Sequence, residues 1–213
     1  MMRAMLKRFA VIALLGLSGP AMAQDGPPPA RTDTVMLETA LGSVTLEIAS
    51  ELAPVTAANF LRYVQEKRFD GTKFYRAMRL EWGDQPNGLD QAGTQMDPDR
   101  IREPIAHEPT SVTGVTHVAG AISMARYAPG TATGDFSILL SDMPSLDADP
   151  ASQDEDVRAG FAAFGRVVEG MEVVRAIFDA PTDPDKGEGW MKGQMLAEPV
   201  AILRARCTTC ASP

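Results

Sequence analysis

Histidine and cysteine are scarce in this 213-residue chain, which has two residues of each. The first histidine, in His107-Glu108, is not followed by a second one at the spacing of a zinc metalloprotease. The sequence also lacks the Gly-x-Ser-x-Gly elbow of serine hydrolases and a glycine-rich phosphate loop. We therefore expect no metal ion and no other cofactor.

Positive charge is in short supply as well. Lys and Arg number 20 against 28 Asp and Glu, which gives a formal net charge of −8. Nucleic-acid binding usually depends on a basic surface, so no nucleic-acid partner is expected. Five acidic residues lie between Asp147 and Asp156, but this segment lacks the central glycine and the ligand spacing of an EF-hand. It is therefore interpreted as a solvated loop rather than a calcium site.

The two cysteines, Cys207 and Cys210, form a Cys-Thr-Thr-Cys motif near the C-terminus. In a thioredoxin-like unit such a motif opens a helix after a strand. Only three residues follow Cys210 in this sequence, so we do not expect that arrangement. A local disulfide, or a pair without a role, in a tail of residues 207–213 is favoured over a redox function.

Long apolar runs are absent too. The apolar run near the start, Phe9–Leu17, is too short to span a bilayer, which needs about 20 residues. Three basic residues precede it, and Ala21-Met22-Ala23 follows it as a small-residue cleavage site. This pattern predicts a secretory signal peptide over residues 1–23, in preference to an N-terminal membrane anchor.

Residues 24–33 contain Gly-Pro-Pro-Pro and little that could pack, so they are interpreted as a linker. A single folded domain is expected over residues 34–206. No later segment is apolar for long enough to span a membrane, and no membrane anchor is predicted. We expect an exported, soluble monomer, periplasmic if the source is Gram-negative and secreted otherwise.

Apolar and polar residues alternate over Ser43–Ile48, which indicates a strand with one buried face. A weaker strand around Val35 and Leu37 precedes it, and Ala40-Leu41-Gly42 fits the turn of a hairpin. Pro54 then opens a helix, with apolar residues at helical spacing up to Val64.

A second short helix is predicted after Gly170, marked by Met171, Val174 and Ile177. The segment 83–104 is rich in Gly, Pro, Asp and Asn and is interpreted as a long loop. Further strands are predicted over residues 73–78, 120–125, 136–140, 161–168 and 199–206. Two isolated helices among many strands disfavour a doubly wound sheet and favour a mainly β, closed, mainly antiparallel barrel.

Four segments carry motifs in a fixed order. They read LAPVTAANF over Leu52–Phe60, FDGTKFYR over Phe69–Arg76, ISMA over Ile122–Ala125 and FGRVVEGM over Phe164–Met171. In that order they resemble the A-P-x-x-x-x-N-F, F-Y-x-x-x-x-F-H-R, S-M-A and F-G-x-V-x-x-G-M motifs of the cyclophilin-type peptidyl-prolyl isomerases. The resemblance spans nearly the whole mature chain and implies a closed, cyclophilin-like eight-stranded antiparallel barrel with two capping α-helices.

The same resemblance implies a set of site residues. The family's catalytic arginine falls on Arg76, and its active-site glutamine falls on Gln91 after about seven extra loop residues. The implied substrate-binding positions are Leu89, Ala125, Arg126, Asp135, Ser137, Leu146 and Phe161. Ser137 stands in place of a pocket Phe, Ser145 in place of a Trp, and Phe161 in place of a His. The proline pocket is therefore expected to be rebuilt.

The chemistry of X–Pro isomerisation fits an arginine at position 76. The barrier is amide resonance, about 18–20 kcal/mol, and no covalent bond has to break. An arginine that donates a hydrogen bond toward the prolyl nitrogen favours the twisted amide, in which that nitrogen regains its lone pair. The alternative for Arg76 is an ordinary surface ion pair on a strand.

The leading functional hypothesis is a peptidyl-prolyl isomerase that assists the folding of exported proteins. Its expected partners are proline-containing peptides or unfolded exported proteins. The second hypothesis is a non-catalytic proline-peptide-binding module on the same barrel. The third is an inert, envelope-associated interaction protein. An isomerase assay on short X–Pro peptides separates the first hypothesis from the other two.

Overall fold

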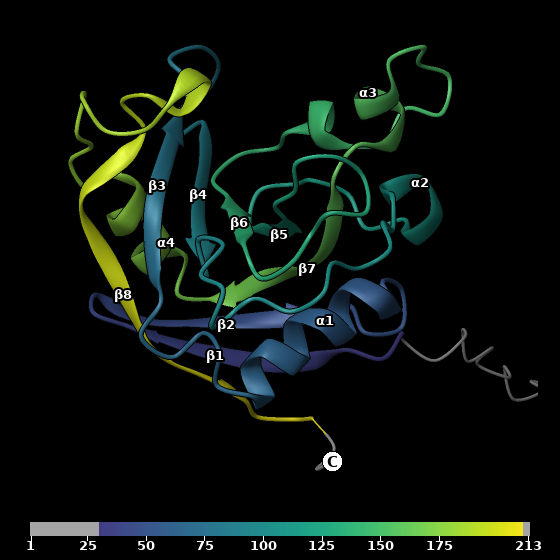
Figure 1. The fold of residues 1–213 in the computed structure, drawn as a ribbon, viewed down its shortest axis with the longest axis horizontal. Coiled ribbons are helices and arrows are strands. Elements are labelled where there is room, and N and C mark those ends of the chain that lie inside the picture. The colour runs from purple at the N-terminus through teal and green to yellow at the C-terminus, as the bar shows by residue number, and fades with distance from the viewer. Residues whose placement is uncertain (1–29, 211–213) are drawn as a thin grey trace, which may run out of the picture.

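A closed barrel of antiparallel strands forms the centre of the computed structural model, which describes residues 30–210 (Figure 1). The order around the barrel is β1-β2-β7-β5-β6-β4-β3-β8, and β8 pairs with β1 to close it. The strands are β1 (Asp33–Thr39), β2 (Gly42–Ile48), β3 (Lys73–Arg79), β4 (Gly88–Gly93), β5 (Ala121–Met124), β6 (Phe136–Leu139), β7 (Ala162–Glu169) and β8 (Met195–Cys207). The predicted fold class is confirmed.

The N-terminal segments predicted from the sequence fall largely outside the described part of the chain. The signal peptide over residues 1–23 lies wholly outside it, and so does most of the linker over residues 24–33. The last linker residue, Asp33, already belongs to β1. Between residues 30 and 210, no helix has the length and apolar character needed to cross a membrane.

The predicted hairpin is the first element of the barrel. β1 and β2 pair in antiparallel register from Asp33 with Ile48 to Thr39 with Gly42. The alternating apolar residues of both strands, Val35, Leu37, Val44, Leu46 and Ile48, are fully buried in the barrel core. The period of two in the sequence therefore does select the inner face of the sheet.

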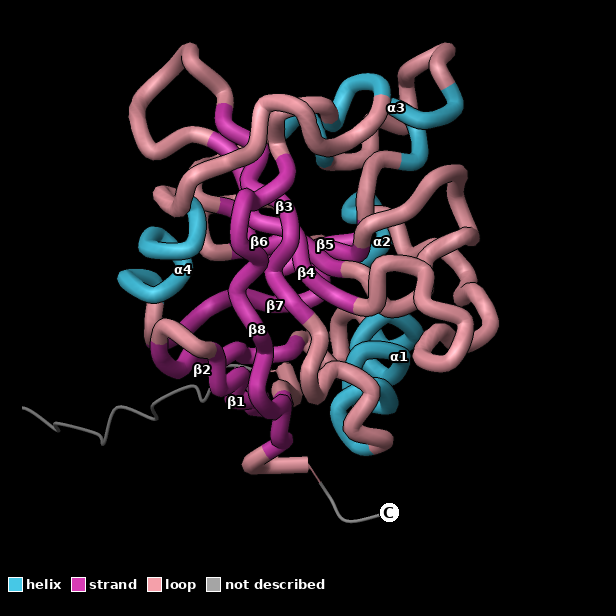
Figure 2. The backbone as a smooth tube through the Cα atoms, turned by 60° about the vertical axis from the view of Figure 1, so that its left-hand side comes forward, coloured by secondary structure: helices cyan, strands magenta, loops and turns pink. Residues whose placement is uncertain are grey.

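Two helices cover the barrel on opposite sides, as Figures 1 and 2 show for α1 (Pro54–Gln65) and α4 (Met171–Phe178). Phe60 of α1 reaches into an aromatic cluster with Phe69, Phe136 and Phe164, with ring centroids 5.1 to 5.3 Å apart. Burying such rings stabilises a core by about 1.5–3 kcal/mol each. The two capping helices are thus held by the apolar faces that the sequence predicted.

The structure corrects several predicted boundaries. The segment 83–104 is not one long loop, because β4 (Gly88–Gly93) lies within it, paired with β3 on one side and β6 on the other. β8 begins at Met195, before the predicted residue 199. Four short helices were missed: α2 (Thr110–Thr113), α3 (Glu155–Ala159), and the 3₁₀ turns η1 (Pro144–Leu146) and η2 (Gly189–Met191). Each is too short to show a periodicity.

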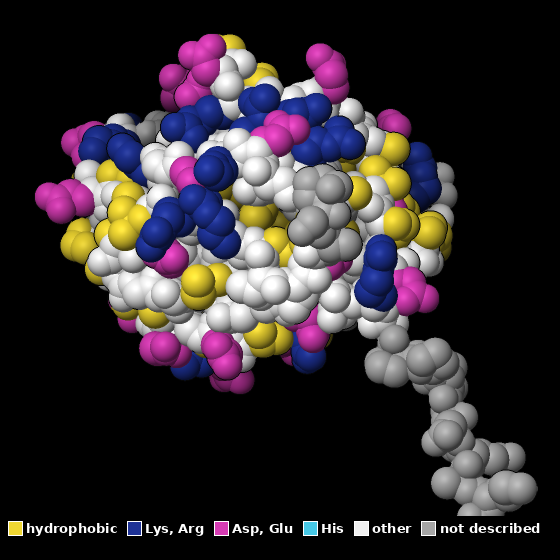
Figure 3. Space-filling view, turned by 90° about the horizontal axis from the view of Figure 1, so that it is seen from below, with side chains coloured by type: hydrophobic (Ala, Val, Ile, Leu, Met, Phe, Trp, Pro, Cys, Tyr) yellow, Lys and Arg dark blue, Asp and Glu magenta, His cyan; other side chains and the backbone are white. Residues whose placement is uncertain are grey.

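The charged residues on the underside of the barrel are mixed in sign, with Lys and Arg beside Asp and Glu in Figure 3. Arg204 of β8 pairs with Glu38 of β1, and Arg166 of β7 pairs with Glu47 of β2. Such exposed cross-strand pairs contribute little stability individually. At the end of β8, Cys207 and Cys210 form the local disulfide that the sequence favoured.

Candidate active site

A row of polar side chains crosses four neighbouring strands on the outside of the barrel. Arg76 of β3 pairs with Gln91 of β4, and Gln91 pairs with Ser137 of β6. Ser137 in turn pairs with Ser123 of β5. Ile138, next to Ser137 in the chain, is buried in the barrel core, so the row faces outward. The barrel therefore brings the two predicted catalytic residues, Arg76 and Gln91, together.

The Arg76 guanidinium is held on three sides. Its Nη1 donates to Gln91 Oε1 at 2.6 Å, and its Nε donates to Gln194 Oε1 at 2.9 Å. The ring of Trp190 lies over it, with the centroid 4.5 Å from Cζ. Within residues 30–210, Nη2 is buried and has no hydrogen-bond partner. Burial lowers the pKa of Arg76 to about 10, so the side chain stays charged at neutral pH with one donor unused.

Tyr75, Asp135 and the loop after β4 form a buried polar cluster beside Arg76. The register of β3 shifts between Phe74 and Arg76, and the Tyr75 hydroxyl donates to Asp135 Oδ1 at 3.3 Å. Asp135 Oδ1 also accepts from the Gln95 backbone N–H at 2.8 Å. Burial raises the pKa values of both Tyr75 and Asp135. The carboxylate predicted to bind substrate thus anchors the loop, while the Asp135 carbonyl accepts from the backbone of half-buried Ala125.

An apolar cluster lies on the other side of the polar row. Leu89 packs there with Leu139 and Met143, and Leu146 covers them from η1. The Phe161 backbone N–H donates to the Leu146 carbonyl at 2.8 Å, which fixes Phe161 beside it. Three predicted pocket residues, Leu89, Leu146 and Phe161, are therefore gathered in one region. Ser137, which would replace a pocket Phe, is buried in the row itself.

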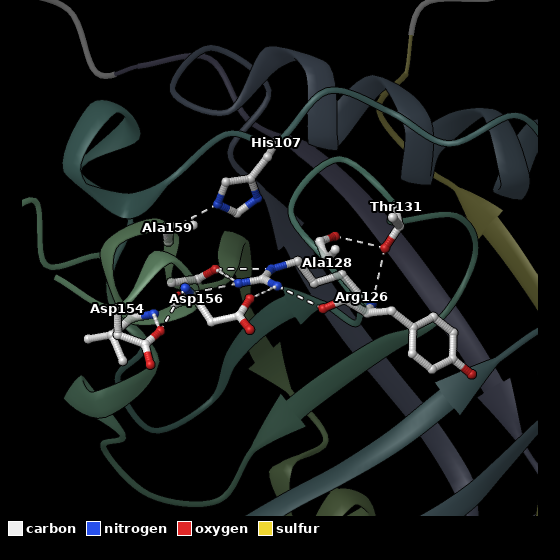
Figure 4. Close-up of polar contacts among 10 residues, drawn as sticks. His107, Arg126, Ala128, Thr131, Asp154, Asp156 and Ala159 are labelled. Atoms are coloured by element: carbon white, nitrogen blue, oxygen red, sulfur yellow. Dashed lines mark hydrogen bonds and ion pairs between the residues drawn. The ribbon is translucent and has the colours of Figure 1, made fainter. Parts of the chain in front are cut away.

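Arg126, another predicted substrate-binding residue, holds the loop around α3 (Figure 4). Its Nε and Nη2 donate to the Gly160 carbonyl at 3.1 and 2.7 Å. Its Nη1 donates to Asp156 Oδ1 and to the Tyr127 carbonyl, each at 2.9 Å. The guanidinium also stacks over the Phe161 ring, 4.6 Å from the centroid. With its side chain only 2% exposed, Arg126 is committed to this loop.

The acidic segment from Asp147 to Asp156 is mostly exposed, as expected for a solvated loop, but it also contains the start of α3 and makes specific contacts. Asp156 pairs with Arg126, and Asp154 Oδ1 caps α3 by accepting from the backbone N–H groups of Asp156 and Val157. Capping bonds of this kind are typical of aspartate at a helix start.

A buried histidine that the sequence analysis passed over ties this segment to the barrel. His117 Nδ1 lies 2.6 Å from Asp147 Oδ1, and His117 Nε2 lies 2.8 Å from Ser123 Oγ. The arrangement has the connectivity of a Ser-His-Asp triad. However, His117 is 1% and Ser123 3% exposed, so a substrate cannot reach the serine. The trio instead links β5 to η1, and burial lowers the pKa of His117.

Two more residues of the site come from the segment between α4 and β8, which contains no motif of the family. Gln194 and Trp190 both contact Arg76, from 118 and 114 positions further along the chain. The surface has two shallow hollows, and the smaller one is lined by Tyr75 and Met195, close to Arg76. The larger, of about 450 Å³, lies against Tyr127 and Thr131, and the smaller has a volume of about 350 Å³.

Comparison with known proteins places this architecture. The family model described as "Cyclophilin type peptidyl-prolyl cis-trans isomerase/CLD" matches residues 34–206. A peptidyl-prolyl cis-trans isomerase of Acinetobacter baylyi is 33% identical over 183 residues, covering 84% of this chain and 85% of that protein. The isomerase ppi1 of Schizosaccharomyces pombe is also 33% identical, over 80% of this chain and 96% of that protein.

A solved cyclophilin-type isomerase of Cryptosporidium parvum, determined in the presence of the dipeptide Ala-Pro, has a similar fold. It superposes with a TM-score of 0.64 at 17% sequence identity, over 83% of this chain and 99% of that one. The closed barrel with its two capping helices is thus the cyclophilin fold. The chain belongs to the family of cyclophilin-type peptidyl-prolyl cis-trans isomerases, and its activity is that of an isomerase.

Proposed function

We propose that this protein isomerises X–Pro bonds in exported polypeptides and that Arg76 stabilises the twisted amide. One observation carries the proposal. The Arg76 guanidinium is fixed by Gln91 and Gln194 on the outer face of the barrel, and its Nη2 is a donor without a partner within residues 30–210. A donor held in place in advance is what a transition state with a developing lone pair requires.

Arg76 has to supply only part of the lowering of the isomerisation barrier. A roughly 10⁵-fold acceleration corresponds to about 7 kcal/mol of barrier lowering. One charge-assisted hydrogen bond to the prolyl nitrogen contributes about 1.5–3 kcal/mol of this. The remainder comes from holding the peptide in the reactive geometry, with Gln91 anchoring a substrate carbonyl. In this proposal Leu89, Leu146 and Phe161 provide the apolar socket, and Leu89 and Leu146 already belong to one packed cluster.

Proline-containing peptides are the proposed substrates, which agrees with the Ala-Pro dipeptide named for the Cryptosporidium structure. Export is proposed from the basic and apolar pattern before Ala23. N-terminal sequencing of the protein recovered from the cell exterior or periplasm is expected to read from Gln24. Recovery only from the cytoplasm, with Met1 intact, would overturn export without affecting the isomerase assignment.

The proposal for Arg76 is tested with a prolyl-isomerisation assay on short peptides that vary the residue before proline. Arg76→Ala is expected to lower kcat/KM by at least ~30-fold, because about 2 kcal/mol of transition-state hydrogen bonding is lost. Arg76→Lys is expected to be impaired as well, since an ammonium lacks the planar fork that holds two glutamines at once. Peptide binding should fall less than turnover.

A matched control is Arg166→Ala, which removes an exposed arginine on β7 that pairs with Glu47. Its activity is expected to stay at the wild-type level, and circular dichroism checks that each variant folds. Full activity in a folded Arg76→Ala variant would refute the catalytic assignment. A wild-type protein that binds every peptide and isomerises none would favour a binding module instead.

A further inference from the structure

The guanidinium assigned to the prolyl amide is covered in this structure. Arg76 lies on the outer face of the barrel, yet it is only 4% exposed. Trp190 lies over one face of the guanidinium, and the hydrogen bonds to Gln91 and Gln194 occupy Nη1 and Nε. The unpartnered Nη2 is buried. A peptide amide therefore cannot reach Arg76 unless part of this cover moves.

Trp190 is a part of the cover that does not belong to the barrel sheet. The side chains of the barrel row come from paired strands, whereas Trp190 belongs to η2, a single turn in the segment between α4 and β8. The ring rests on Arg76, but the residue is 71% exposed. Large exposed aromatic residues at a site are typical of surfaces that contact a ligand.

The backbone around Trp190 allows a local rearrangement. Gly187, Gly189 and Gly193 all adopt positive φ, at 88°, 55° and 80°. A Cβ on Gly189 would meet nothing within 4 Å, so position 189, next to Trp190, faces open space, whereas a Cβ on Gly187 would meet the Met191 carbonyl oxygen at 2.5 Å. Glycines in such conformations are common where a loop changes its path at little cost.

Gln194 connects the position of Trp190 to Arg76. Its Nε2 donates to the Trp190 carbonyl at 2.9 Å, and its Oε1 accepts from Arg76 Nε. Gln194 lies next to Met195, where β8 begins and pairs with Arg76. The segment is fixed to β8 at its start as well, because Thr182 forms a bridge with Leu196. Within the segment, the Gln194 side chain links the Trp190 carbonyl to Arg76.

We infer that Trp190 belongs to the substrate-binding site and competes with the prolyl peptide for the face of the Arg76 guanidinium that the indole covers. This inference rests on the proposed function. In the empty site the indole covers the guanidinium, and on binding the peptide displaces it. The apparent affinity for peptide is then the intrinsic affinity multiplied by the fraction of free molecules in which the indole is displaced. Removing the ring is expected to strengthen binding rather than weaken it.

The kinetic test compares Trp190→Ala with two matched variants on the tetrapeptide Ala-Ala-Pro-Ala. Trp190→Ala is expected to lower KM ~3- to 10-fold and to leave kcat within about twofold of wild type. Trp190→Phe keeps an aromatic ring, so its KM should lie between the values for wild type and Trp190→Ala. Trp82→Ala removes the other exposed tryptophan, which is 69% exposed and does not stack on Arg76, and should match wild type.

A second measurement follows the indole directly. In a Trp82→Phe background Trp190 is the only tryptophan of the chain. Saturating Ala-Ala-Pro-Ala is expected to increase the quenching of its fluorescence by acrylamide, because the ring leaves Arg76. Arg76→Ala in the same background should increase quenching without any peptide. This second readout does not depend on catalysis.

The possible results separate this inference from the proposed function. If wild type is active, an unchanged or higher KM in Trp190→Ala overturns the competition and leaves the isomerase assignment standing. Reduced quenching on peptide binding also overturns it, because Trp190 would then be a fixed wall of the pocket. If wild type and Trp190→Ala both fail to bind and to isomerise the peptide, both proposals fall. Activity in Trp190→Ala alone supports both.

Discussion

Asp90 gives the sharpest prediction about stability. It lies on β4 between Leu89 and Gln91, and the alternation of that strand directs it into the barrel. It is 0% exposed, and within residues 30–210 neither carboxyl oxygen has a hydrogen-bond partner. Burial raises the pKa of Asp90 to about 8, with Asp179 also raising it and Arg79 opposing the rise. Asp90 is therefore protonated in the folded protein at neutral pH.

The raised pKa of Asp90 makes the free energy of unfolding depend on pH, through proton linkage. In the unfolded chain Asp90 ionises near its ordinary pKa of 3.8, so between that pH and about 8 the folded state binds more protons. The free energy of unfolding then falls with rising pH by up to about 1.4 kcal/mol per unit. At pH 7, roughly three units above the ordinary pKa, the accumulated loss is about 4 kcal/mol.

Asp90→Asn removes this titration and keeps the shape of the side chain. An unpartnered amide is about as costly to bury as an unpartnered carboxylic acid, so the two proteins should be similarly stable near pH 4. At pH 7 the variant is expected to be more stable by about 2–4 kcal/mol, with the difference levelling off above pH 8.

The assay is urea denaturation of both proteins at one-unit steps from pH 4 to pH 9. Taking the difference at each pH cancels other groups whose pKa burial raises, such as Asp135. Asp84→Asn, which changes an exposed aspartate in the loop before β4, is the control and should run parallel to wild type. A pH-independent difference between Asp90→Asn and wild type would refute the reasoning.

Two further predictions concern the loop that borders the site. Arg126→Ala is expected to cost about 2–3 kcal/mol of stability and to speed proteolysis near α3, because charge-assisted bonds to Gly160 and Asp156 are lost; proteolysis as slow as in wild type would contradict this role. His117→Ala is expected to cost about 2 kcal/mol at pH 8, with little further loss on adding Ser123→Ala, since the two share one buried bond. Because burial lowers the pKa of His117, folding excludes a proton that the unfolded chain binds below pH 6.5, so the cost of His117→Ala should shrink as the pH falls through that range. Denaturation at pH 5 and pH 8 measures this, and an equal cost at both would contradict it.

Local pattern was enough to predict the frame of the molecule. The alternation over Ser43–Ile48, the proline that opens α1 and the spacing of apolar residues in α4 all describe contacts between a residue and the core as a whole. Such contacts depend on the period of the chain and not on the identity of a partner. Arg76, by contrast, was located by the resemblance of Phe69–Arg76 to a family motif and not by any period of the chain.

Tertiary structure alone decided β4 and the surroundings of the site. The six residues Gly88–Gly93 contain no β-branched or aromatic side chain, and they form a strand because β3 and β6 offer hydrogen bonds on both sides. Trp190 reaches Arg76 across more than a hundred residues, from a turn without any periodic pattern. Likewise, the guanidinium of Arg126 is held by acceptors on Gly160 and Asp156, 34 and 30 residues further along the chain. These roles depend on which groups the closed barrel brings within hydrogen-bonding or stacking distance, and a single sequence does not encode that proximity in any local period.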